Sequence, residues 1–419
     1  MSTELASATS PVTSVSQLRL VVILGSLTAF APMSIDLYLP AFPELTRHFR
    51  VSQASVQLTL TACVVGFVLG HLLAGPCSDA MGRRRPLLIG LAVYVAASVG
   101  CALAPSAAIL TGLRLVQGLA GAAGLVIARA VVRDLYSGIA LARFFSLLMV
   151  VTGLAPVLAP LIGSQLIQVV PWQGLFAVLT GYGLLLLVSV GFGLPETLPP
   201  LARRRGGLRV TGRVMRQLLG DRRFVAYALA SGLVFAAMFS YIAGSPFVLQ
   251  QIYGLSPQLY GVVLGMNGLG IAVLGQLNRL LLRWLPPRRL LAAGLVLAAL
   301  GGVGVITAVL AGLGLPVILP TLFAVVASVG VVLPNSTALA LSGRPEQAGS
   351  ASTLFGALQY LLGAVAASLV AASGAGTAVP MAALMCGLTL AGLAMFVLLN
   401  ADRPSAKTTT GRLAGLAAR

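Results

Sequence analysis

Residues 61–100 read TACVVGFVLGHLLAGPCSDAMGRRRPLLIGLAVYVAASVG, two apolar runs joined by a short loop that carries three consecutive arginines. Each run, with its apolar flanks, reaches roughly the 20 residues that an α-helix needs to cross a bilayer's hydrocarbon core. Similar runs follow one another along the chain, near 18–41, 54–76, 87–105, 107–130, 144–169, 172–194, 224–250, 258–283, 289–311, 314–341, 347–372 and 378–400. The sequence therefore predicts an all-α integral membrane protein with twelve transmembrane helices.

The basic residues predict the orientation of these helices. All but Arg47, Arg50 and Arg114 of the 27 basic residues fall on one set of alternate connections or in the tails. Cytoplasmic loops keep Lys and Arg because these side chains are costly to move across the membrane. We therefore expect a multi-pass protein of the cytoplasmic (inner) membrane with both termini in the cytoplasm. The net charge of +18 follows this topology, without aromatic interleaving or a basic domain, so we expect no nucleic-acid partner.

The longest polar interruption, 195–223, divides six predicted helices from six and carries eight arginines. We predict a cytoplasmic tail at 1–17, a six-helix half at 18–194, a basic linker at 195–223, a second half at 224–400 and a tail at 401–419. Two pseudo-symmetric halves are common in secondary transporters, which bind their substrate between them. The linker could lie on the membrane as an amphipathic helix or be a solvated tether.

Composition excludes several classes of protein. The chain is 58% hydrophobic and 9% charged, with a mean hydropathy of +0.99, which rules out an ordinary soluble protein. Four cysteines and two histidines lack metal-ligand spacing, and no P-loop is present, so we expect no metal, no cofactor and no enzyme. Ala29-Phe30-Ala31 resembles a signal-peptidase site, but Pro32 would follow the cut, so we expect an uncleaved first helix that contacts membrane lipid.

Two charged residues lie inside predicted helices and away from the helix ends. Eight of the nine acidic residues fall in loops, tails or helix ends, and Asp36 is the exception. Among the basic residues, only Arg114 lies at a comparable place inside a helix. At 1.5 Å per residue, both lie roughly 10–12 Å from the same membrane surface. An ionisable group at this depth is expensive and marks an ion or substrate pathway by default. We predict that Asp36 is the proton-linked acid and that Arg114 is its charge partner or organises its site; a purely structural ion pair is the alternative.

The loop after the second run has an ordered set of residues. Its pattern is Gly-x-x-x-Asp-x-x-Gly-Arg-Arg, which fits a tight hairpin with a glycine-permitted turn and an acid that accepts hydrogen bonds. This order resembles the loop signature of the major facilitator superfamily, except that Ala80 replaces the usual basic residue. The resemblance implies a gating role for Gly75, Asp79, Gly82, Arg83 and Arg84.

Further motifs resemble one branch of that superfamily. Residues 114–118 look like its Arg-x-x-Gln-Gly motif, and the doubled Ala-Pro of 153–163 resembles the antiporter motif of drug exporters. With Asp-Leu-Tyr-Leu-Pro (36–40), Ala-Val-Val-Arg-Asp-Leu-Tyr (130–136), Pro-Glu-Thr-Leu (195–198) and Tyr-Ile-Ala-Gly-Ser-Pro-Phe-Val (241–248), the chain resembles the Bcr/CflA drug-resistance exporters. The resemblance implies gating roles for Gly153, Pro156, Pro160 and Gly163, since proline interrupts a helix.

Neutral polar and aromatic residues inside the runs are candidates for a binding cavity. Aromatic walls with a few amides suit an amphiphilic, loosely defined ligand. Hydrogen bonding between helices is the alternative role for each residue. The candidates for substrate binding are Tyr38, Gln117, Tyr241, Ser245, Phe247, Asn267, Asn335, Gln359 and Tyr360.

These features predict a monomeric transporter that exports small amphiphilic drugs or metabolites in exchange for protons by alternating access. A proton-coupled uptake symporter for a small metabolite on the same fold is the main alternative. A membrane-embedded enzyme would need clustered His, Cys or carboxylates, and a sensor would carry a soluble signalling domain; neither is evident.

Overall fold

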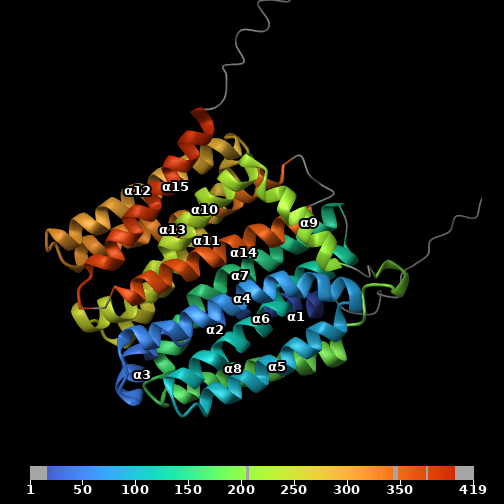
Figure 1. Cartoon of the computed structure of the whole chain (residues 1–419), viewed down its shortest axis with the longest axis horizontal. Helices are drawn as coiled ribbons and strands as arrows, with labels where there is room; N and C mark the ends of the chain where they lie inside the picture. Colours follow the sequence, from blue (N-terminus) through green and yellow to red (C-terminus); the bar gives the residue numbers. More distant parts are fainter. Residues whose placement is uncertain (1–16, 137, 204–206, 343–347, 374–375, 402–419) are drawn as a thin grey trace, which may run out of the picture.

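The computed structural model describes residues 17–136, 138–203, 207–342, 348–373 and 376–401, and this part of the chain contains helices and no strands (Figure 1). The helices of the first half are α1 (Gln17–Thr28), α2 (Phe30–Asp36), η1 (Leu39–Ala41), α3 (Phe42–Phe49), α4 (Gln53–Met81), α5 (Arg84–Ala102), α6 (Ala107–Leu135), α7 (Gly138–Leu166) and α8 (Trp172–Gly193). They are followed by η2 (Pro200–Ala202), α9 (Gly207–Leu219), α10 (Arg222–Phe247), η3 (Val248–Ile252), α11 (Pro257–Leu281), α12 (Pro287–Leu310), α13 (Leu315–Leu341), α14 (Ala348–Ala372) and α15 (Val379–Ala401).

The order of the helices fits the predicted twelve-span architecture. Within the described residues, ten helices are long and apolar enough to cross a membrane, and the bent pair at the start brings the number to eleven. Helix α7, with 29 residues, occupies the fifth place in the series. The helices α4 and α6 continue about one turn beyond the apolar runs predicted from the sequence.

The two sets of helices lie side by side. In Figure 1 the first half, from α1 to α8, occupies the lower part of the view, and α10 to α15 occupy the upper part. Contacts between the halves run mainly along α4 with α14 and α7 with α11. We call the end of the bundle near α9 the linker end, and the opposite end the α3 end.

The first membrane-spanning segment is interrupted twice by proline. Its two parts, Leu18–Thr28 and Phe30–Phe49, meet at a bend of 42°. Pro32 has no N–H to donate to the carbonyl of Thr28, which explains the break between α1 and α2. Pro40 likewise cannot bond to the carbonyl of Asp36, and α2 ends at that residue. Asp36 therefore lies at an interruption in its helix.

The linker forms structure of its own. Helix α9 lies within it, and Leu218 of that helix is fully buried in a cluster with Phe224 and Tyr227 of α10. The linker helix thus packs on the second half of the bundle at this point. The side chains of Val210 and Val214 lie outside the described ones.

Candidate transport site

Arg114 lies at the centre of a buried polar cluster in the first half. Its side chain is fully buried on α6. Nη1 donates to Oε1 of Gln117 over 2.5 Å, and Nη2 donates to the carbonyl of Ser34 on α2 over 2.7 Å. The guanidinium carbon also lies 4.4 Å from the centre of the Tyr38 ring. Helix ends carry unpaired carbonyls with partial negative charge, which suit a guanidinium.

A second layer of hydrogen bonds orients this cluster. Gln117 Nε2 donates to Ser98 Oγ on α5 over 2.7 Å, which turns its amide oxygen toward Arg114. Ser34 Oγ and Tyr94 OH are 2.7 Å apart. The cluster thereby joins α2, α5 and α6 through neutral groups.

The predicted pairing of Asp36 with Arg114 is not present. In the part of the chain that the structure describes, Asp36 makes no ion pair and no hydrogen bond. The reason is helical geometry: residues two apart point to nearly opposite faces of a helix. Because Ser34 faces Arg114, Asp36 faces the second half. The alternative, that Arg114 organises the site of Asp36, stays a prediction.

Asp36 faces tyrosines of the second half. Its carboxylate interacts electrostatically with Tyr241 on α10, Tyr260 on α11 and Tyr360 on α14. Tyr241 OH accepts from Asn267 Nδ2 over 2.8 Å. The Asp36 side chain remains partly exposed, although protein surrounds it densely. It therefore reaches an internal space between the halves.

Ser245 extends this group of tyrosines. Its Oγ lies 3.0 Å from the hydroxyl of Tyr260. Both side chains are fully buried. The predicted residues Tyr241, Ser245 and Asn267 are thus brought together on α10 and α11, around two of the tyrosines that interact with Asp36.

An aromatic cluster surrounds Tyr360. Its ring stacks on Phe67 of α4 with centroids 6.0 Å apart, and lies 5.3 Å from the ring of His71. Phe235 and Phe239 of α10 complete the cluster at 5.3 and 6.2 Å. The halves are thus in apolar contact at this depth. Gln359, the next predicted residue, is 9% exposed on the same helix and makes no described hydrogen bond.

Two predicted binding residues lie elsewhere. Asn335 Nδ2 donates to Asn278 Oδ1 over 2.6 Å, an amide pair between α13 and α11 close to the linker end. This contact fits the alternative of interhelical hydrogen bonding. Phe247 lies toward the α3 end, where its ring packs 5.9 Å from that of Phe42.

The predicted gating loop forms an ionic network at the linker end. Arg83 pairs with Asp79 and, through Nε over 2.8 Å, with Oδ2 of Asp134 on α6. Burial would lower the pKa of Arg83, but the bonds and charges of Asp134 and Asp79 raise it above its usual value. The loop is thereby held to the end of α6.

Glu196, from the Pro-Glu-Thr-Leu motif, binds the start of α5. Its carboxylate accepts from the backbone N–H groups of Arg83 over 2.8 Å and Arg84 over 3.2 Å. Burial would raise the pKa of Glu196, but these hydrogen bonds, one from Leu198 N–H and the charge of Arg203 lower it. Glu196 thus caps the free N–H groups at the N-terminus of α5.

The glycine-permitted turn of this loop lies at Gly82. Gly75 lies inside α4, which continues through Pro76 to Met81. Gly82 has φ of +92°, a conformation that favours glycine, and a Cβ there would lie 2.4 Å from Glu196 Oε2. The close approach of Glu196 therefore depends on Gly82.

The glycines and prolines of α7 form part of the contact between the halves. A Cβ at Gly268 of α11 would lie 2.9 Å from the backbone of Pro156, and one at Gly261 would lie 2.9 Å from the carbonyl of Pro160. A Cβ at Gly163 would lie 1.9 Å from the carbonyl of Leu37. Gly153 faces Ala272 of α11 with more room. The motif thus brings α7 close to both α11 and the broken first segment.

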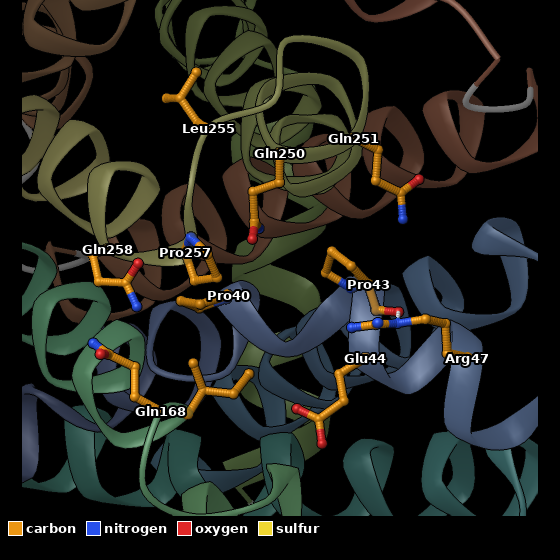
Figure 2. A pocket seen from close by; sticks show the side chains of 11 residues that line it. Pro40, Pro43, Glu44, Arg47, Gln168, Gln250, Gln251, Leu255, Pro257 and Gln258 are labelled. Atoms are coloured by element: carbon orange, nitrogen blue, oxygen red, sulfur yellow. Dashed lines mark hydrogen bonds between the residues drawn. The ribbon is translucent and has the colours of Figure 1, made fainter.

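A cavity of about 320 Å³ lies at the α3 end, between the halves (Figure 2). Its lining comes from η1 and α3, the end of α7, η3 and the start of α11. Figure 2 shows several amide side chains around it, including Gln168, Gln250 and Gln258. None of the predicted substrate residues lines it.

The hydrogen bonds between the halves lie at the same end. Among the described residues, Gln53 Nε2 donates to Gln251 Oε1 over 2.5 Å, and Gln57 Nε2 donates to the carbonyl of Ala243 over 2.9 Å. No other hydrogen bond in the described part of the chain joins 17–194 to 222–401 directly. The halves are thus closed against each other at the α3 end.

Sequence reasoning missed several residues of the site. Phe67, His71 and Phe235 resemble ordinary apolar-face residues in the sequence, and only the fold brings them to Tyr360. Arg129 was not singled out because it lies one residue before the end of the predicted run 107–130, whereas α6 continues to Leu135.

The comparisons with known proteins agree with this architecture. Residues 24–368 match the Major Facilitator Superfamily. The chain is 38% identical over 393 residues to the Bacillus subtilis (strain 168) protein named "Uncharacterized MFS-type transporter YdgK", covering 92% of this chain and 96% of the relative. It is 32% identical over 361 residues to a bicyclomycin resistance protein homolog of Haemophilus influenzae, covering 85% of this chain and 90% of the relative.

A solved structure shows the same fold. The xylose transporter XylE from E. coli, in a partially occluded inward-open conformation, aligns with a TM-score of 0.70 at 15% identity, over 94% of this chain and 99% of that one. The match of the family over most of the chain, together with its apolar helices, shows a multi-pass membrane protein: the chain belongs to the major facilitator superfamily of transporters.

Proposed function

We propose that the protein exports small amphiphilic compounds in exchange for protons, by alternating access of a site between its halves. The observation that carries the proposal is Asp36: a partly exposed carboxylate at a helix break, facing the tyrosines of the second half and lacking a described ion-pair partner. Such a group can bind and release a proton as the space around it opens to either side. Proton and solute can then exclude one another from the same site, as exchange of one for the other requires.

The resistance-protein relative and the motifs shared with Bcr/CflA exporters support the same direction of transport. We assign solute binding to the predicted residues around Asp36, with Tyr241, Ser245 and Asn267 as its neutral polar part. The predicted gating residues of the 75–86 loop and of α7 would control opening at the linker end.

The proposed orientation places the linker end in the cytoplasm. Arg84, Arg203 and Arg279 are among the basic residues at this end, and basic residues resist translocation. Both termini would then be cytoplasmic, in the inner membrane. The closed α3 end would face outward.

The test is Asp36→Asn, which keeps the shape of the side chain but cannot ionise. A resistance panel in a pump-deficient host first identifies a fluorescent drug that the wild-type protein exports. Asp36→Asn should abolish uncoupler-sensitive efflux of this drug at normal expression, whereas the control Glu44→Gln, an acid at the α3 end, should retain it. Undiminished, uncoupler-sensitive efflux by Asp36→Asn would show that the coupling acid lies elsewhere.

Vesicles distinguish export from uptake. Under the proposal, inside-out vesicles accumulate the drug when their lumen is acidified. Accumulation by right-side-out vesicles along an inward proton gradient would instead support the symporter alternative.

A further inference from the structure

Arg129 is a cation within α6 that has no described partner. It lies six residues, or about 9 Å, before the end of the helix at Leu135. In the described part of the chain it makes no hydrogen bond and no ion pair. Arg114 on the same helix and Arg83 at the linker end, by contrast, are both bonded.

The Arg129 side chain points between the halves. It interacts electrostatically with His71 on α4 and with Tyr360 on α14, in the other half. The residue is exposed. A side chain on the outer, lipid-facing surface would not reach both His71 and Tyr360, so Arg129 faces the space between the halves.

Among the described residues, no acid pairs with this positive charge. Arg133, one turn further along, is also exposed and adds a second positive charge that repels the first. The nearest acid on the same helix, Asp134, is occupied by Arg83 and by the hydroxyl of Thr197. Asp36 supplies a negative charge deeper in the bundle, and Tyr360 interacts with both Asp36 and Arg129.

An uncompensated guanidinium attracts an anion. Its planar fork binds a carboxylate or phosphate through two parallel charge-assisted hydrogen bonds. Basic side chains near a membrane surface also attract anionic lipid head groups. The direction of Arg129 toward Tyr360 favours a solute between the halves over a lipid at the outer surface.

We propose that Arg129 is the docking residue for an anionic group, a carboxylate or phosphate, of the solute that the protein moves. This inference rests on the proposed export function and adds a substrate class to it. The anionic end binds on the linker side of Tyr360, and the rest of the amphiphile extends along the aromatic cluster toward Asp36.

The test uses the purified full-length protein in detergent, with 4-phenylbutyrate and its uncharged amide as matched probes. Unfolding is followed by tryptophan fluorescence. In the wild-type protein, the carboxylate should stabilise at about tenfold lower concentration than the amide, since one charge-assisted contact has roughly that effect. Arg129→Gln should remove the difference, Arg129→Lys should keep part of it, and the exposed-residue control Arg85→Gln should keep all of it.

Several outcomes would overturn the inference. Equal stabilisation by the two probes in the wild-type protein, or a preference that survives in a folded Arg129→Gln protein, would contradict a docking role. The measurement is repeated in detergent micelles that contain either phosphatidylethanolamine or the anionic phosphatidylglycerol. If the carboxylate stabilises the protein only in the absence of phosphatidylglycerol, a lipid head group is the occupant. The assay needs no proton gradient, so Asp36→Asn should keep the preference even if the export proposal fails.

Discussion

At the residue scale, the first half accommodates a buried charge without a buried acid. A guanidinium removed from water loses hydration, which its surroundings must replace. Arg114 gains the carbonyl of Ser34, the amide oxygen of Gln117 and the face of the Tyr38 ring. Each hydrogen bond to a charged group contributes about 1.5–3 kcal/mol. The acid that could have neutralised Arg114 remains available for the other half.

Arg114→Lys tests this account. An ammonium keeps the charge but lacks the planar fork, so it cannot bond in both directions from the same position. We expect a lower melting temperature in detergent and partial export of the drug. Arg85→Lys, an exposed residue at the start of α5, serves as the control. Wild-type stability and export in the Arg114→Lys protein would leave the cluster without a structural role.

At the element scale, the close contact of α7 with the broken first segment depends on the absence of a side chain. A Cβ at Gly163 would lie 1.9 Å from the carbonyl of Leu37, just after the end of α2. Backbone cannot yield as a flexible side chain can. Small residues at such contacts let helices pack closely where lipid supplies no hydrophobic driving force.

Gly163→Ala should therefore destabilise the protein by about 1–3 kcal/mol, the usual range for overpacking. The matched control is Gly181→Ala in α8, where a Cβ would meet nothing within 4 Å. Alanine there should leave stability unchanged or raise it by about 0.5–1 kcal/mol, since it favours the helix. Thermal unfolding of the two proteins in the same detergent is the measurement. Equal melting temperatures would show that α7 can move away from Leu37 without loss of stability.

The elements were largely predictable, whereas their interruptions were less so. Hydrophobic runs predicted α8 and α13 to within a residue at each end, because lipid imposes length and polarity on the sequence. The break at Asp36 was not predicted, although Pro32 and Pro40 are visible in the sequence. A proline is compatible with both a kink and a full interruption, and tertiary packing decides between them.

At the scale of the whole molecule, ion pairs hold the linker end and neutral contacts join the halves at the other. Orientation in the membrane can be tested on a background without the four native cysteines. We expect an impermeant thiol reagent to label Gly376→Cys in intact cells and to leave Gly212→Cys unlabelled until the cells are opened. Both positions are exposed, and a Cβ meets nothing at either. The opposite pattern would reverse the proposed direction of transport.

The site was predictable only in part at this scale. Asp36, Tyr241 and Asn267 could be identified because polar groups are rare in apolar helices. The relation of Asp36 to Arg114 could not be predicted, since it depends on which face of α2 Asp36 occupies once the helix is broken. Arg129 was missed because it lies at the end of the predicted run 107–130, where a charge is ordinary, whereas the helix continues to Leu135.

The amide contacts at the α3 end have a consequence for the environment in which the protein works. Gln53, Gln57 and Gln251 carry no charge, so dissolved salt does not screen their bonds and acidity does not titrate them. The ion pairs of Arg83 at the linker end face the regulated interior under the proposed orientation. The outward closure should hold equally well in dilute or saline, acidic or neutral surroundings, which a cell cannot control.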